Sequence, residues 1–410
     1  MAGTNRSGRR GSDSGSVGRA SVGSASVSGS VGASVGASAG GSKPRKKKRS
    51  TIPRWARVCT ILGAVLMVVS GGLLVTSEAL LARYEGAVSQ EDLFGDGQVD
   101  QPADIEGPLN ILLVGIDPRD SESLPLADSI MILHVPASHD RAYLFSLPRD
   151  LVVEIPAFKP ADFNGGTGKL NAAMMYGSRV PGGGKPDRAR GFELLSKTIT
   201  RYTGIARFDA GAIVNFNGFK KIVDAMGGVT MYIDQDVESE HLQPNGDPRP
   251  NNGSGSAHPY SGPQAEYKKG TRHLKGWQAL DYVRQRYGLP KGDYDRQRHQ
   301  QQFVRAMAKQ ALSAGVVTNP IKLDKVLRAA GQAVVFNGRG RKITDFGWAL
   351  RNLREDSIMM VKLEGGGVGT GRNYQGEALN AVSRGFLDSV RTGTVDQFMV
   401  ANPELVNREK

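Results

Sequence analysis

The sequence predicts an α/β domain, built on a mixed central sheet with helices on both faces and preceded by one transmembrane helix. From residue 109 onward, short runs rich in Ile, Leu, Val and aromatic residues alternate with segments of helical periodicity. Strands interleaved with helices in this way are typical of α/β folds. Earlier in the chain, residues 58–77 form a run of twenty uncharged residues. A helix of that length spans roughly 30 Å, the thickness of a bilayer's hydrocarbon core.

The charges beside the apolar run predict its orientation. Eight Lys and Arg residues lie between residues 43 and 57, whereas five acidic residues follow within twenty residues after Ser77. By the positive-inside rule, residues 1–53 form a cytoplasmic tail, residues 54–77 cross the cell membrane once, and the rest of the chain is extracellular. A cleaved signal peptide is the alternative, but the run starts more than fifty residues into the chain and lacks a clear A-x-A site.

The formal net charge of +13 is concentrated in the amino-terminal tail. Residues 1–57 contain twelve Lys and Arg residues against one acidic residue, Asp13, so the rest of the chain is almost neutral. Because this basic tail adjoins the apolar run, we interpret it as a segment attracted to anionic lipids; a nucleic-acid-binding arm is the alternative. Residues 11–42 are almost entirely Gly, Ser, Ala and Val and are expected to be disordered. The only cysteine, Cys59, lies in the apolar run, so the exported domain is expected to fold without a disulfide.

The remaining chain divides into three predicted parts. Residues 78–106 are acidic and are expected to form an extracytoplasmic stalk. Residues 107–395 are expected to form the α/β domain, and residues 396–410 a C-terminal tail. Buried strands are predicted over 110–117, 128–135 and 141–148. Helices are predicted over 169–177 and 192–204, and the stretch 210–233 is predicted to fold as strand, helix, Gly-Gly stop and strand.

The second half of the domain is predicted to be mostly helical. The stretch 239–270 is polar and dense in Pro, Gly and Asn, and is expected to be a long loop of the kind that is functional or disordered. After it, helices are predicted over 276–283, 295–314, 321–333, 343–354 and 376–391, with one strand over 357–363.

Charged residues lie at the ends of the first three predicted strands. They are Asp117 with Arg119, Asp128, and Arg149 with Asp150. Ligands of open α/β sheets bind beyond strand ends, where loops supply the functional groups. These residues are therefore candidates for a binding site, and solvated ion pairs are the alternative for each of them taken singly.

A second basic group follows the long loop and consists of Arg284, Arg286, Arg296 and Arg298. Arg284 and Arg286 point to the same side only if the segment is extended, so the helix from Gly276 is expected to end by about residue 283. Arg296, His299 and Gln300 fall on one face of the next helix. Together, carboxylates and arginines at strand and helix ends match a magnesium-bridged diphosphate, because Mg²⁺ prefers carboxylate oxygens and Arg grips phosphate oxygens bidentately.

The sequence resembles the LytR-CpsA-Psr family of Gram-positive cell envelopes over most of residues 109–310. Six landmarks in order carry the resemblance: NILLVGIDPRD, LADSIMILHV, LFSLPRDLVVEIP, KLNAAMMYG, the stretch from Phe219 to Val229 that ends in DAMGGV, and LKGWQALDYVRQR with GDYDRQRHQQ. The resemblance implies a membrane-bound, magnesium-dependent phosphotransferase. Such an enzyme moves an anionic glycopolymer, such as a teichoic acid, from a polyprenyl-pyrophosphate carrier to peptidoglycan and leaves a phosphodiester.

The resemblance also implies roles for individual residues. It places the metal ligands, for Mg²⁺ with Mn²⁺ as an alternative, at Asp117 and Asp128. The implied pyrophosphate-binding arginines are Arg149, Arg284, Arg286 and Arg296, and the implied further contributors to substrate binding are Arg119 and Lys169. Of these residues, Asp117, Asp128, Arg149, Arg284 and Arg286 are the expected catalytic set. The chain departs from the family pattern at His299, where the family often has an arginine, and Arg298 is displaced by one residue.

The expected reaction is attack of a sugar hydroxyl on the diphosphate, whose negative charge the metal and the arginines neutralise. Position alone leaves Asp128 and Asp150 as alternatives for the general base. The apolar carrier tail is expected in a groove between sheet and helices. Two other functions stay open, a membrane-anchored binder of polyprenyl lipids and an envelope regulator that attenuates transcription. Nucleic acid is not expected as a partner, because the charged residues of the candidate site lie outside the membrane.

Overall fold

The computed structural model describes residues 89–97, 105–117, 120, 122–253, 258–313, 325–326, 328–329, 331, 334–350 and 353–407. The predicted cytoplasmic tail and the predicted membrane helix over 54–77 lie outside these residues, as does most of the helix predicted over 321–333. Within the described part of the chain, no helix is both long enough and apolar enough to span a bilayer.

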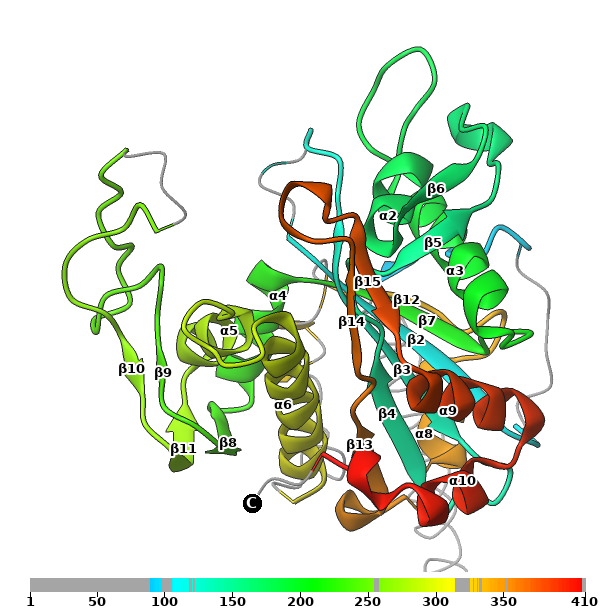
Figure 1. The fold of residues 1–410 in the computed structure, drawn as a ribbon. Helices are drawn as coiled ribbons and strands as arrows, with labels where there is room; N and C mark the ends of the chain where they lie inside the picture. The colour runs from blue at the N-terminus through cyan, green and yellow to red at the C-terminus, as the bar shows by residue number, and fades with distance from the viewer. Residues whose placement is uncertain are drawn as a thin grey trace, which may run out of the picture. The chain divides into compact units, whose positions relative to one another are not determined.

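A seven-stranded mixed sheet forms the centre of the fold (Figure 1). In spatial order its strands are β1 (Ser89–Gln90), β12 (Val334–Asn337), β7 (Ala210–Asn215), β2 (Leu109–Ile116), β3 (Ala127–Val135), β4 (Ala142–Ser146) and β13 (Ile358–Val361). β2 pairs antiparallel with β3 and parallel with β7, and β4 pairs antiparallel with β3 and parallel with β13. The three strands predicted over 110–117, 128–135 and 141–148 are confirmed as β2, β3 and β4. Their apolar runs are continuous because both faces of the sheet are covered.

Helices cover both faces of this sheet, as predicted. One face packs against α2 (Leu170–Gly177), α3 (Arg188–Thr203), α9 (Ala381–Thr392) and α10 (Val395–Ala401) in the main core. The other face packs against α6 (Asp293–Ser313) and α8 (Ile343–Ala349). Successive residues of β2 show the division, since Leu112 faces the main core and Ile111 faces the core that contains Phe346 of α8.

A smaller core lies beside the sheet and also includes residues of α6 (Figure 1). It contains α4 (Phe216–Ala225), β8 (Val229–Ile233), β9 (Val237–Glu238), β10 (Glu266–Tyr267), β11 (Gly270–Leu274) and α5 (Gly276–Arg284). The predicted Gly-Gly stop between α4 and β8 is confirmed. Gly228 has a φ of +97°, and a Cβ there would lie 2.4 Å from His273 Nε2, so this turn requires glycine.

The stretch 239–270 is irregular over most of its length, as predicted, but it is held together from inside. The buried guanidinium of Arg249 donates hydrogen bonds to the backbone oxygens of Glu240 at 2.7 Å and of Gly262 at 3.1 Å. Burying a guanidinium is costly unless such acceptors satisfy it. These bonds tie the two sides of the stretch to each other.

Two hairpins and short 3₁₀ turns complete the fold. The hairpins are β5 (Val152–Ile155) with β6 (Gly166–Lys169), and β14 (Gly365–Val368) with β15 (Gly376–Leu379); the 3₁₀ turns are Lys159–Ala161, Glu355–Ser357, Gly371–Asn373 and Pro403–Leu405. β15 corrects the helix predicted over 376–391, which begins only at Ala381. Asn380 caps it, because its side chain accepts a hydrogen bond from the Ser383 backbone N–H.

The folded unit extends beyond the predicted limits of 107–395 at both ends. Leu93 and Phe94, from the predicted stalk, are buried in the main core, and the Phe94 ring meets Phe192 edge to face at 5.5 Å. From the predicted C-terminal tail, Val406 bridges to β13 and Asn407 donates a 2.8 Å hydrogen bond to Gln301. Apolar burial therefore makes residues 89–97 and 396–407 part of the domain.

Candidate active site

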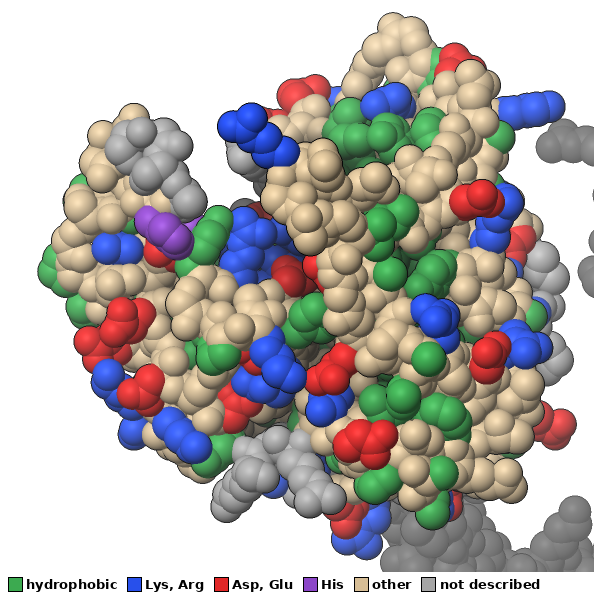
Figure 2. Space-filling model, in the orientation of Figure 1, with side chains coloured by type: hydrophobic (Ala, Val, Ile, Leu, Met, Phe, Trp, Pro, Cys, Tyr) green, Lys and Arg blue, Asp and Glu red, His purple; other side chains and the backbone are tan. Residues whose placement is uncertain are grey.

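A polar pocket of about 320 Å³ lies where β2 ends, β3 begins and α5 is followed by α6. All five predicted catalytic residues line it, together with Arg296. Its full lining is Asp117, Asp128, Arg149, Phe216, His241, Arg284, Gln285, Arg286, Tyr287, Arg296 and Gln300. Figure 2 shows a hollow between the part of the molecule that carries α5 and the part that carries the β14–β15 hairpin, where Lys and Arg side chains gather beside Asp and Glu.

The antiparallel register of β2 and β3 brings the two predicted metal ligands to one edge of the sheet. Ile116, at the end of β2, pairs with Ala127, at the start of β3. Asp117 follows the first of these residues and Asp128 follows the second. The two aspartates, which are separated by ten residues in the chain, therefore line the same pocket.

Arg284 and Arg286 lie at the start of an extended segment, as their spacing predicted. α5 ends at Arg284, and Gln285 is extended, with φ −63° and ψ 135°. The Gln285 side chain is buried and donates a 2.7 Å hydrogen bond to Asp281 Oδ1, while both arginines line the pocket. Alternation along an extended segment therefore presents both guanidinium groups to the same space.

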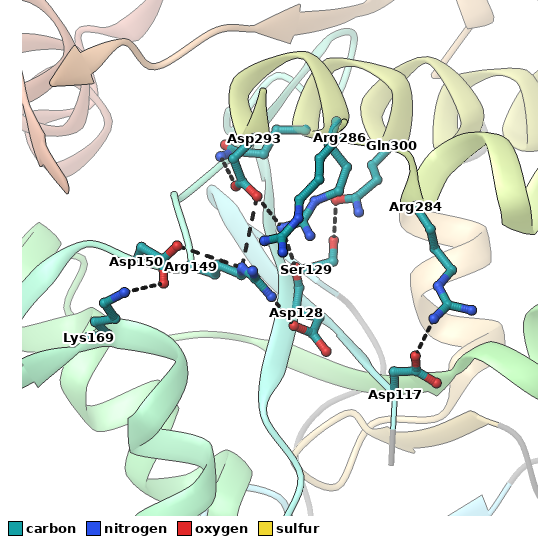
Figure 3. A network of polar contacts seen from close by, with 12 residues as sticks. Asp117, Asp128, Ser129, Arg149, Asp150, Lys169, Arg284, Arg286, Asp293 and Gln300 are labelled. Carbon is teal, nitrogen blue, oxygen red and sulfur yellow. Dashed lines mark hydrogen bonds and ion pairs between the residues drawn. The ribbon is translucent and has the colours of Figure 1, made fainter. Parts of the chain in front are cut away.

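Arg149 is the most heavily paired cation of the site (Figure 3). Its Nη1 lies 2.5 Å from Asp128 Oδ1, and its Nε lies 3.8 Å from Asp150 and 3.9 Å from Asp293. Burial lowers the pKa of the Arg149 guanidinium, but the carboxylates of Asp128, Asp293 and Asp150 outweigh burial and hold that pKa above its usual value. Arg149 is therefore positively charged at neutral pH.

A second ion pair lies at the other end of the pocket. Arg284 Nη2 lies 2.7 Å from Asp117 Oδ2, and its guanidinium stacks 5.0 Å from the Phe216 ring. His241 also lines the pocket, and burial, followed by the nearby Arg284 charge, lowers its pKa below the ordinary value of 6.5. A neutral imidazole beside the arginines is the consequence at neutral pH.

The carboxylates of this pocket fit a partly substrate-bound magnesium ion. Among the described residues, no group of three or more His, Cys, Asp or Glu side chains could hold a metal ion by itself. Asp117 and Asp128 supply two carboxylates in one pocket. Mg²⁺ is commonly held by one or two carboxylates, with waters and substrate phosphate oxygens completing its shell. The donor set therefore suits Mg²⁺ only when a phosphorylated ligand contributes the remaining oxygens.

Three of the predicted or noted residues lie elsewhere. Lys169 contacts Asp150 at 3.2 Å, outside the polar pocket. His299 was expected on one face with Arg296 and Gln300, but its ring stacks on Tyr282 at 4.5 Å and its Nε2 faces Asp234 at 3.3 Å. Arg298 also pairs with Asp234, at 2.6 Å. Arg119 lies outside the described residues.

Sequence reasoning assigned no role to several residues in or beside the pocket. Asp293 begins α6 and pairs with Arg296 at 2.7 Å, an i,i+3 spacing that the sequence displays. Gln300 had been placed on the face of Arg296, and it accepts a 2.8 Å hydrogen bond from Ser129 Oγ on β3. His241 and Tyr287 line the pocket through long-range packing, for which the sequence carries no local signal.

An apolar cavity of about 220 Å³ adjoins the polar pocket. It lies between β2, β3 and β7 on one side and α4 and α6 on the other, and it shares Phe216 and Gln300 with the polar pocket. Its other lining residues are Leu113, Val114, Gly115, Ser129, Met131, Val214, Phe219, Ile222, Val223, Val283, Phe303, Val304 and Met307. The predicted groove between sheet and helices is thus present beside the charged residues.

Known proteins with similar sequences include cell-wall proteins. The cell wall biosynthesis protein LcpA of Corynebacterium glutamicum is 28% identical over 342 residues, covering 77% of this chain and 61% of that protein. The chain thus matches less than two thirds of LcpA's length. The polyisoprenyl-teichoic acid–peptidoglycan teichoic acid transferase TagU of Oceanobacillus iheyensis is 29% identical over 301 residues, covering 71% of this chain and 79% of TagU.

A solved structure and a family model also match this chain. A structure of TagT bound to LIIa-WTA has a TM-score of 0.51 at 20% identity and covers 75% of this chain and 99% of that one, which supports the α/β fold. The model of the LytR_cpsA_psr family matches residues 77–392, most of the chain and all of the landmarks identified in its sequence. The chain therefore belongs to the LytR_cpsA_psr family.

Proposed function

We propose that this chain is a phosphotransferase that moves an anionic glycopolymer from a polyprenyl-pyrophosphate carrier to peptidoglycan and leaves a phosphodiester. One observation carries the proposal: the polar pocket, with its arginines and paired aspartates, adjoins an apolar cavity with which it shares Phe216 and Gln300 as lining residues. A diphosphate joined to a long hydrocarbon has this same division between charged and apolar parts. The activity in the name of TagU is of this kind.

The apolar cavity suits the first isoprene units of the carrier, since its walls are almost wholly hydrocarbon. The diphosphate then lies in the polar pocket, where Arg149, Arg284, Arg286 and Arg296 can donate hydrogen bonds to its oxygens. Asp117 and Asp128 would hold Mg²⁺, which supplies further neutralisation of the diphosphate charge. We also propose that the domain works at the outer face of the cell membrane, as the charges beside residues 58–77 predict.

The reaction is a substitution at the phosphorus that carries the glycopolymer. A peptidoglycan hydroxyl oxygen forms the new P–O bond, the bond to the polyprenyl phosphate breaks, and polyprenyl phosphate leaves with the bonding electrons. Arginine donors stabilise the charge that builds on this leaving group. The hydroxyl proton passes to a carboxylate, and Asp150 suits this role better than Asp128. Asp128 is held by Arg149 at 2.5 Å on the diphosphate side, whereas Asp150 lies on the other side of Arg149.

Transfer by the purified full-length chain in detergent tests the proposal. The assay combines a polyprenyl-pyrophosphoryl oligosaccharide labelled in its sugar, peptidoglycan, and Mg²⁺. Label is expected in the peptidoglycan, with one polyprenyl phosphate released for each chain transferred, and chelation is expected to stop both. Tight binding of the donor lipid without any transfer would instead identify a lipid-binding protein.

A further inference from the structure

A second polar pocket lies beside the first, and of its lining residues only Asp150, the proposed proton acceptor, has been given a role so far. Its volume is about 130 Å³, and it is lined by Pro148, Asp150, Lys291, Asp293, Tyr294, Gln297, Tyr374 and Glu377. None of these residues lines the diphosphate pocket. We call it the Tyr374 pocket.

Arg149 lines the diphosphate pocket and pairs with carboxylates that line the Tyr374 pocket. Its Nη1 pairs with Asp128, which lines the diphosphate pocket, and its Nε lies within 3.9 Å of Asp150 and Asp293, which line the Tyr374 pocket. Figure 3 shows this order: Asp150 and Lys169 lie on one side of Arg149, and Asp117 with Arg284 lies on the far side of Asp128. A group in the Tyr374 pocket is therefore next to the diphosphate but outside its binding site.

The wall of the Tyr374 pocket is held in place by a network centred on Glu377. Tyr374 donates a 2.7 Å hydrogen bond to Glu377 Oε1, and Tyr294 donates a 3.1 Å hydrogen bond to Oε2. Glu377 N donates to the Asp150 carbonyl at 2.8 Å, which fixes the β14–β15 hairpin to the segment that carries Arg149. Burial and the Glu377 carboxylate raise the pKa of both phenols, so both remain hydrogen-bond donors at neutral pH.

The chemistry of this pocket suits a saccharide. Tyr374 is 41% exposed, so part of its ring is open to contact with a sugar's C–H groups, and the Lys169 ammonium lies 5.3 Å from the ring centroid. Carboxylates of Asp150 and Asp293 accept hydrogen bonds from hydroxyls, and Lys291 and Gln297 can donate to hydroxyl or amide oxygens. Aromatic surface beside mixed donors and acceptors distinguishes this pocket from the arginine-rich one.

The geometry of an in-line displacement indicates whether this saccharide belongs to the donor or to the acceptor. The nucleophile and the leaving group lie on opposite sides of the reacting phosphorus. The apolar cavity adjoins the diphosphate pocket and shares Phe216 and Gln300 with it, so a carrier seated in the cavity leaves as polyprenyl phosphate on that side. The Tyr374 pocket lies on the other side of Arg149. We propose that the Tyr374 pocket binds the acceptor saccharide of peptidoglycan and presents its hydroxyl to the phosphorus; this assignment rests on the proposed function.

Three variants of the full-length chain test the assignment. Tyr374→Ala removes the ring, Tyr374→Phe removes only the hydroxyl, and Trp348→Ala removes another exposed aromatic side chain, 67% exposed, that lines neither pocket. The measurements are KM for the peptidoglycan acceptor, KM for the polyprenyl-pyrophosphoryl donor, and melting temperature. A further measurement, made without donor, is the Kd of a soluble oligosaccharide of alternating N-acetylglucosamine and N-acetylmuramic acid.

Tyr374→Ala is expected to raise the acceptor KM and the oligosaccharide Kd about five- to ten-fold, with the donor KM and melting temperature unchanged. Tyr374→Phe is expected to change the acceptor KM and the oligosaccharide Kd by less than about three-fold, because the ring remains. Trp348→Ala is expected to match the unmodified chain. An unchanged acceptor KM in folded Tyr374→Ala would overturn the assignment, and a raised donor KM alone would place the donor's glycan in this pocket.

The binding measurement separates failure of this assignment from failure of the proposed function. If the unmodified chain transfers nothing, the transferase proposal fails, and the oligosaccharide titration still decides the pocket. Binding that weakens in Tyr374→Ala would support a saccharide site. Absent binding, or binding of equal strength in Tyr374→Ala, would overturn it.

Discussion

Arg284 donates a 2.7 Å hydrogen bond to the carboxylate of Asp117, although 167 positions separate the two residues in the chain. Arg149 and Asp128 form the corresponding pair at 2.5 Å. Each aspartate proposed to hold metal is therefore neutralised by an arginine proposed to hold diphosphate. When a metal–diphosphate ligand binds, each aspartate can exchange its arginine for the metal, and each arginine can exchange its aspartate for a phosphate oxygen. No charge is then left without a partner, which keeps the cost of desolvating the site low.

Replacing either Arg284 or Arg286 with Ala is expected to reduce transfer roughly thirty-fold or more. Loss of one partner of a charge-assisted pair in a binding site costs on the order of 2–5 kcal/mol, and each 1.4 kcal/mol is a tenfold factor. Initial rates of transfer by the purified full-length variants measure the effect, and melting temperatures show whether each variant is folded.

Lys268 and Lys269 provide the matched control for this comparison. Lys268 pairs with Glu266 at 2.9 Å on the surface, and both lysines lie away from the polar pocket. Replacing either with Ala is expected to cost under about 1 kcal/mol, because exposed ion pairs are weak. Equal, small effects at all four positions would mean that the arginines are a solvated surface, and the transferase proposal would lose its main support.

Asp128→Asn is expected to lower magnesium-dependent transfer by about two orders of magnitude while the fold survives. The change keeps the shape of the side chain but removes the negative charge that the metal and Arg149 both require. The measurement is transfer rate against Mg²⁺ concentration, repeated with Mn²⁺, and the half-saturating metal concentration should rise. A variant that keeps full activity and normal sensitivity to chelator would show that Asp128 is not a ligand.

Val214→Trp is expected to obstruct the apolar cavity and raise the KM of a long-chain donor. Val214 is the last residue but one of β7 and lines the cavity, and a Trp there would occupy a substantial part of a space of about 220 Å³. The effect should depend on the carrier, with a donor of two isoprene units less affected than a donor of ten or more. Equal KM changes for both donors would show that the hydrocarbon does not enter this cavity.

His134 is expected to make the protein less stable in acid. Burial, opposed in part by Asp396, lowers the pKa of His134 from 6.5 to about 4. Between these values the unfolded chain binds a proton that the folded chain does not, so stability is full above pH 6.5 and falls as pH drops towards 4. Each pH unit contributes up to about 1.4 kcal/mol, so the total loss is roughly 3 kcal/mol.

Urea unfolding of the unmodified chain and of His134→Gln between pH 7 and pH 4 measures this contribution. The variant is expected to start less stable, because His134 Nδ1 lies 2.8 Å from Asn110 Oδ1 in the folded protein. Its free energy of unfolding should then fall less steeply with acidification. Parallel pH profiles for the two proteins would show that another group controls acid stability.

Local sequence determined the parts of this protein whose signals repeat within a few residues. Continuous apolar runs predicted β2, β3 and β4, because a strand buried on both faces needs no polar residue in its interior. The two-residue spacing of Arg284 and Arg286 predicted that both face one pocket, since alternation is a property of the extended backbone itself. The family motifs supplied predicted roles for the site residues, and these roles, the membrane helix and the magnesium ion stay predictions.

Tertiary structure alone decided which distant residues meet. Nothing local distinguishes His299, which turns to Asp234, from Gln300, which reaches β3. Burial of Leu93 and Asn407 likewise depends on partners far away in the chain, so the domain's ends lay beyond the predicted limits. The Tyr374 pocket required β15 to pair beside Asp150, more than two hundred residues from it. Such contacts depend on the free energy of packing the whole fold, which cannot be deduced from a short segment of sequence.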